Sequence, residues 1–170
     1  MNIDWTLVSS LAAVVAAISA IIALIVQTSH SRRAMAIEML WKLEARFFSD
    51  PVMLENRRRA AKAQLKGETP YELIQVLHVL EIIGSHLRRG FLDRELVWSH
   101  FCYWVIYYCA AYRDQIAEEK RTDTTVWSNL DYLFREMTDM DAKKRSLPKE
   151  RIIPTPQEVS KFLEEESVRV

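Results

Sequence analysis

An unbroken apolar run lies near the start of the chain: residues 7–26 read LVSSLAAVVAAISAIIALIV, without one charged side chain. Because a helix rises about 1.5 Å per residue, a run of this length spans roughly 30 Å, the hydrocarbon thickness of a bilayer. The run is longer than the apolar core of a cleavable signal peptide, and its basic flank, Arg32 and Arg33, follows it instead of preceding it. The pattern therefore predicts an uncleaved transmembrane anchor over residues 1–30.

The distribution of basic residues predicts the orientation of this anchor. No Lys or Arg precedes Arg32, whereas all 23 basic residues follow the apolar run. Cytoplasmic flanks of membrane helices carry the excess of Lys and Arg. We therefore expect a single-pass protein with its N-terminus outside and its C-terminus in the cytoplasm.

Beyond the anchor, apolar residues recur at helical spacing and strong breakers are few. The segment 27–49 contains neither Gly nor Pro, so the helix is expected to continue as a stalk to about Ser49. Later helices are marked by a residue that can cap the first turn. These expected caps are Asp50, Thr69, Asp93, Asp123 and Thr155.

The pattern predicts an all-α protein: a single N-terminal transmembrane helix continuing into a stalk, followed by a cytosolic helical bundle of four to five helices. The expected organisation is an anchor over 1–30, a helical cytosolic domain with the stalk over 31–145, and a tail over 146–170. Prolines mark the start of this tail as an extended linker, and a short helix follows it.

Residues 96–112 (LVWSHFCYWVIYYCAAY) form a second stretch without formal charge. A second membrane span would leave its tyrosine hydroxyls without partners in lipid. A helix that is apolar nearly all round also suits the centre of a bundle. We therefore expect a buried central helix here, whose two cysteines, Cys102 and Cys109, are free thiols.

The balance of basic and acidic residues bears on the class of partner. The chain has 23 basic and 23 acidic residues, whereas general nucleic-acid binders carry a basic excess, so nucleic acid is not an expected partner. The chain lacks a glycine-rich phosphate loop and a Cys-x-x-Cys pair. His78 and Glu81 share a helix face but His86 does not, so we expect neither a metal nor a cofactor.

Two groups of residues are candidate interaction surfaces. Small residues at four-residue spacing let helices approach closely in lipid, although alanine is also simply tolerated there. A basic patch beside a membrane attracts anionic headgroups, although such residues are often paired with acids. The candidate association face is Ser9, Ala12, Ala13, Ala16, Ala17 and Ala20, and the candidate lipid-facing patch is Arg32, Arg33, Arg57, Arg58 and Lys62.

One pair of residues raises an enzymatic alternative. Arg94 and His100 have the Arg-x5-His spacing of helical HEPN ribonucleases, whose active site is built from such pairs across a dimer. Two residue types at one spacing also arise by chance. The pair therefore supports a ribonuclease only as an alternative, and no catalytic residue is assigned.

Several short motifs occur together between residues 80 and 134: LEIIGSHLRRGFLDRELVWSHF, then Tyr112-Arg113, then DTTVWSNLDYLF. Over roughly residues 35–137 the chain resembles a bacterial family of unknown function numbered 4760. The resemblance implies one N-terminal membrane helix and a small helical domain at a bacterial inner membrane, and it supplies no activity. The tail after Ser146 lies outside it.

Glu81 lies within these motifs beside apolar residues. A partly buried carboxylate needs a partner, and we expect a buried ion pair with Arg113, with Arg88 as the alternative. Such a pair is a structural feature more often than a catalytic one.

These observations favour a membrane-tethered binding or regulatory module that self-associates or recruits a partner at the cytoplasmic face. The expected partners are the lipid bilayer and either further copies of the chain or a membrane or cytosolic protein. The first alternative is a membrane-acting oligomeric effector gated by its cytosolic domain, and the second is the HEPN-like ribonuclease.

Overall fold

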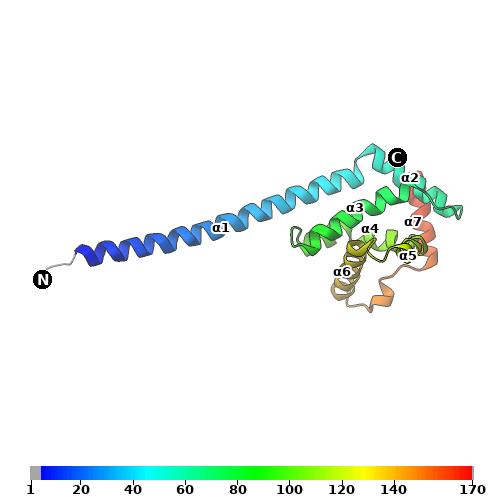
Figure 1. Cartoon of the computed structure of the whole chain (residues 1–170). Helices are drawn as coiled ribbons and strands as arrows, with labels where there is room; N and C mark the ends of the chain where they lie inside the picture. The colour runs from blue at the N-terminus through cyan, green and yellow to red at the C-terminus, as the bar shows by residue number, and fades with distance from the viewer. Residues whose placement is uncertain (1–4, 170) are drawn as a thin grey trace. The chain divides into compact units, whose positions relative to one another are not determined.

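The computed structural model describes the backbone of residues 5–169 and the side chains of residues 18–169. Within this range the chain forms seven α-helices and no strand, which confirms the all-α prediction (Figure 1). The chain divides into two compact units, Met1–Ile37 and Glu38–Val170. In chain order the helices are α1 (Trp5–Phe48), α2 (Pro51–Leu65), α3 (Glu72–Arg88), α4 (Arg94–Ala111), α5 (Arg113–Thr122), α6 (Ser128–Arg145) and α7 (Pro156–Val168), with a 3₁₀ turn, η1 (Lys149–Arg151).

Helix α1 contains the apolar run of residues 7–26 and the predicted stalk. It continues without a break from Trp5 to Phe48, so the expected helical continuation to about Ser49 is confirmed. The first half of the apolar run, residues 7–17, lies outside the residues whose side chains are described. No helix in the described part of the chain meets both the length and the hydropathy that a bilayer crossing requires.

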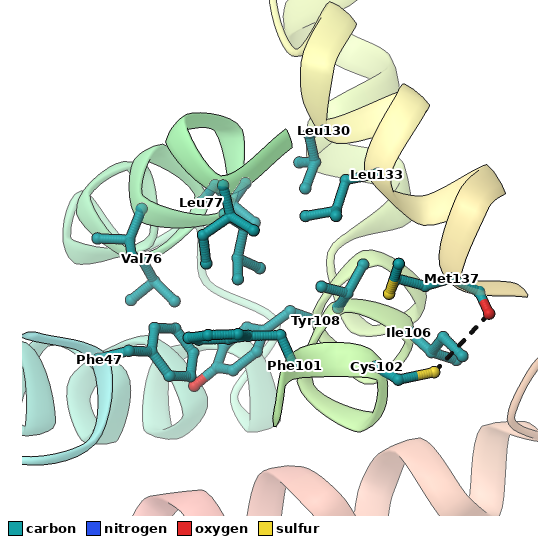
Figure 2. Close-up of a cluster of buried hydrophobic side chains, with 14 of the residues drawn as sticks. Phe47, Val76, Leu77, Phe101, Cys102, Ile106, Tyr108, Leu130, Leu133 and Met137 are labelled. Atoms are coloured by element: carbon teal, nitrogen blue, oxygen red, sulfur yellow. Dashed lines mark hydrogen bonds between the residues drawn. The ribbon is translucent and has the colours of Figure 1, made fainter. Parts of the chain in front are cut away.

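The core of the unit Glu38–Val170 combines the end of α1 with α3, α4 and α6. Leu40 and Phe47 of α1 are almost completely buried there, with Leu77 of α3 and Leu133 of α6. Figure 2 shows this cluster around α4, whose Cys102 thiol lies 3.7 Å from the carbonyl oxygen of Met137. The apolar stretch 96–112 is therefore a helix of the bundle, as expected, instead of a second span.

Three predicted caps are present. The side chain of Asp50 accepts hydrogen bonds from the backbone N–H groups of Val52 and Met53 at the start of α2. Asp93 does the same at α4, and Thr155 forms a reciprocal capping box with Glu158 at α7. Each signal is local, so its geometry follows directly from the sequence.

Two other predicted starts are wrong, and one helix is divided. Helix α3 begins at Glu72 after Tyr71, which forms no side-chain cap, and the carbonyl oxygen of Pro70 accepts a hydrogen bond from the backbone N–H of Leu73. Asp123 closes a turn by accepting from Thr125, so α6 begins only at Ser128. The helical segment that begins at Arg94 is interrupted at Tyr112, where α4 ends and α5 begins.

The tail, predicted as a linker and a short helix over 146–170, lies within the unit Glu38–Val170. Helix α7 packs against α2 and α4, and it buries Phe162 and Leu163. The proline-marked linker was expected to be extended, but it forms the 3₁₀ turn η1 and buries Ile152. Helix α7 packs on the domain because the spacing of its apolar residues gives this short helix one apolar face, whose burial is favourable.

Candidate functional site

A continuous run of exposed large apolar side chains lies on α1 within the unit Met1–Ile37. Its large aliphatic side chains from Ile18 to Val26 have exposed fractions of 50% to 64%. The hydroxyl of Thr28 donates to the carbonyl oxygen of Leu24, so this polar group is satisfied within the helix. Burial of such side chains is favourable by about 25 cal/mol per Å². Residues 18–26 are here called the apolar segment of α1. An exposed apolar surface of this kind marks a site of contact with another protein or with a membrane.

The predicted association face is only partly described. Ser9, Ala12, Ala13, Ala16 and Ala17 lie outside the residues whose side chains the structure describes. Ala20 lies within them and is exposed.

The predicted basic patch is divided by the fold. Arg32, Arg33 and Lys62 are exposed, as a lipid-facing patch requires. Arg58 forms an ion pair with Glu55, which also binds Arg59.

Arg57 does not belong to this patch, because only 1% of its surface is exposed. It lies on the same face of α2 as Met53, Ala60 and Ala61, all of which are buried. Its position in a run of three arginines suggested a surface residue, whereas its spacing from these apolar neighbours places it inside.

Buried Arg57 lies at the centre of a hydrogen-bond network that joins four helices. Its Nε donates to Oε2 of Glu166 at 2.8 Å, and its Nη2 donates to Oε1 at 2.9 Å. Its Nη1 donates to the carbonyl oxygen of Phe47 at the end of α1, at 2.8 Å. The hydroxyl of Tyr108 on α4 donates to Glu166 at 2.6 Å. These contacts tie the C-terminal helix α7 to α1, α2 and α4.

Aromatic rings enclose this network. The guanidinium carbon of Arg57 lies 4.5 Å from the ring centres of both Phe47 and Trp104. Burial raises the pKa of Tyr108 well above its ordinary value, so its hydroxyl stays protonated and can donate. Glu166 was not predicted as a functional residue, although it shares the apolar face of α7 with Phe162 and Leu163.

Glu81 forms a cap instead of the expected ion pair. Its carboxylate, on α3, accepts from the side-chain amide of Asn129 at 2.7 Å and from the backbone N–H of Leu130 at 2.5 Å. These groups belong to the first turn of α6, which has no side-chain cap of its own. Arg113 is exposed on α5 and Arg88 is exposed at the end of α3. The partner of Glu81 is therefore a helix N-terminus, which favours a negative charge.

Glu81→Gln is expected to lower the free energy of unfolding by about 1–2 kcal/mol, because the neutral amide loses the charge-assisted cap on α6. Arg113→Leu is expected to leave that free energy within about 0.5 kcal/mol of the parent. Urea unfolding of both variants measures the difference. If both variants lost the same free energy of unfolding, the result would support the predicted ion pair between Glu81 and Arg113 and contradict the cap.

The two residues of the ribonuclease alternative are bound to different helices. Arg94 forms an ion pair with Glu136 of α6 at 2.8 Å, and Nδ1 of His100 lies 3.2 Å from Glu44 of α1. Six residues apart, the two side chains are rotated by about 120° around α4. Within one chain they therefore do not face a common site.

Among the clefts on the unit Glu38–Val170, two are lined by both apolar and charged side chains of α4 and its neighbours. One, of about 480 Å³, is partly polar and includes Tyr103, Tyr107, Arg145 and Arg151 in its lining. The other, of about 620 Å³, lies between α4, α5, α6 and the segment before α7, and its lining includes Arg113. Among the described residues, no group of three or more His, Cys, Asp or Glu side chains is arranged to hold a metal.

These features define an all-α domain preceded by an apolar helical segment. The chain belongs to the family described as a domain of unknown function, DUF4760, whose model matches residues 8–137. The match extends over most of α1 to the third turn of α6, and α7 lies beyond it. No curated protein and no solved structure matches the chain.

Proposed function

We propose that the chain is a membrane-tethered helical module that self-associates through α1 and presents its folded domain at the cytoplasmic face. The observation that carries the proposal is the exposed apolar segment of α1, residues 18–26, together with the uncharged sequence that precedes it from residue 7. A run of this length is what a bilayer crossing needs. The family match supports the proposal, since it begins at residue 8 and so includes all but the first residue of the run.

The end of α1 explains how such a tether is joined to the domain. Leu40, Leu43 and Phe47 are buried in the core, and the carbonyl oxygen of Phe47 accepts from Arg57. The last turns of α1 are therefore a structural part of the domain instead of a flexible linker. Arg32 and Arg33, both exposed, stand at the position of the cytoplasmic basic flank.

Self-association is favoured over a simple anchor by the composition of the run. Alanine and serine recur at four-residue spacing along it, and small residues allow close packing of helices in lipid. The candidate face centres on Ala13, Ala16 and Ala20. On an ideal helix Leu11 and Ile18 project from the opposite side, which gives a matched control within the same helix.

Single-cysteine cross-linking in native membranes tests this proposal. We expect Ala13→Cys, Ala16→Cys and Ala20→Cys to give oxidative dimers, and Leu11→Cys and Ile18→Cys to give few or none. The two natural cysteines contribute little background, because burial raises the pKa of Cys102 to about 12 and also raises that of Cys109. Dimers from no position, or equally from all five, would contradict self-association through this face.

A further inference from the structure

Arg113 is a residue that the proposed function does not use. It lies within the motif Tyr112-Arg113 and at the start of α5, it is exposed, and no ion pair holds it among the described residues. It borders the cleft of about 620 Å³, a size typical of small-molecule sites. Other residues that line this cleft are Cys109, Ile116, Leu130, Phe134, Ile153 and Val159.

The floor of the cleft is apolar. Ile116 and Leu130 are buried, and the ring of Phe134 is partly buried beside them. Cys109 adds a sulfur without a charge, because burial raises the pKa of its thiol and keeps it protonated. A ligand that fills this floor must therefore have an apolar body.

The lining of the cleft contains one basic and one acidic side chain, Arg113 and Asp131. Asp131 also borders the cleft, but its carboxylate is paired with Lys120. The guanidinium of Arg113 is thus the charge at the rim that lacks a partner among the described side chains. A guanidinium can donate two parallel hydrogen bonds to a carboxylate.

We propose that this cleft binds a single-chain amphiphile with a carboxylate end, of the fatty-acid class. The apolar chain lies on Ile116, Leu130 and Phe134, and the carboxylate pairs with Arg113. One cation at the rim matches one monovalent anion. A neutral apolar ligand leaves Arg113 unused, and a cationic amphiphile is repelled by it. The inference concerns a separate surface from the apolar segment of α1 and does not depend on the membrane tether.

Photolabelling of the full chain in lipid nanodiscs tests the site. The probe is decanoic acid with a diazirine at the chain end, and the matched probe is the corresponding alcohol. After irradiation and digestion, mass spectrometry is expected to find the acid on peptides that contain residues 109–116 and 130–134. The alcohol should label these peptides at least about tenfold less, which is the value of one charge-assisted hydrogen bond.

Variants separate specific binding from partition into lipid. Arg113→Leu is expected to lower labelling by the acid at least about tenfold, because the rim cation is lost. Arg89→Leu, an exposed arginine outside the cleft lining, is expected to leave labelling unchanged. Ile153→Trp fills the cleft from an exposed position and should abolish labelling without lowering the melting temperature. Equal labelling by acid and alcohol, or labelling unaffected by Arg113→Leu and Ile153→Trp, would overturn the proposal.

Discussion

Glu166→Ala is expected to lower the free energy of unfolding by about 3–5 kcal/mol, because it leaves the buried guanidinium of Arg57 without its carboxylate. Both side chains are 99% buried, so water cannot replace the lost partner. The hydroxyl of Tyr108 loses its acceptor in the same variant. Urea unfolding of the full chain, followed by the tryptophan fluorescence of the domain, measures the loss.

The neighbouring residue provides the control for this prediction. Glu165 is exposed and lies 4.0 Å from Lys161, so Glu165→Ala should change the free energy of unfolding by no more than about 0.5 kcal/mol. The double variant Arg57→Met with Glu166→Leu should recover most of the stability, because it removes both buried charges. If Glu166→Ala were as stable as Glu165→Ala, the network would not hold α7 to the domain.

Gly84→Ala is expected to lower the free energy of unfolding by about 3 kcal/mol or more, because the backbones of α3 and α6 are in contact at this position. This value lies at the upper end of the effects of overpacking a core. A Cβ at this position would lie 2.1 Å from the carbonyl oxygen of Asn129 and 2.7 Å from its carbon. Neither atom is the end of a flexible side chain, so the two helices must separate. Glu81, one turn earlier on α3, would then also lose its hold on the first turn of α6.

Ser85→Ala is the matched control, since Ser85 is the next residue on the same helix and only partly buried. Its expected change in the free energy of unfolding is within about 0.5 kcal/mol. Thermal unfolding of the two variants side by side gives the comparison. A Gly84→Ala protein as stable as Ser85→Ala would show that α3 and α6 do not approach this closely.

What could be predicted from the sequence was local. Asp50, Asp93 and Thr155 cap helices through residues two or three positions away, so their effect can be read from short motifs. The helical class and the buried α4 follow from the spacing and density of apolar residues. The break at Tyr112 could not be predicted in the same way, because no Gly or Pro lies between Asp93 and Leu147 to mark it.

The partners of buried charges could not be predicted, because they lie far apart in the chain. Arg57 and Glu166 are separated by 109 residues, and Glu81 meets Asn129 over a separation of 48. The sequence does indicate that both charges are buried, since Arg57 and Glu166 each occupy an apolar position of an amphipathic helix. That spacing shows that each charge is buried, but only the fold shows what neutralises it.

Cysteine accessibility tests most directly whether α1 holds the domain at the cytoplasmic face of a membrane. Asn2→Cys adds a thiol before the apolar run, and Lys161→Cys adds one after it. Lys161 is exposed on α7. The natural cysteines are expected to react slowly with maleimide, since burial raises the pKa of both thiols. Intact and permeabilised cells are treated with a membrane-impermeant maleimide, and the membrane fraction is washed with alkaline carbonate.

We predict that the chain stays in the carbonate-washed membrane, that Asn2→Cys is labelled in intact cells, and that Lys161→Cys is labelled only after permeabilisation. Release of the chain by carbonate, or protection of both cysteines in intact cells, would contradict the account.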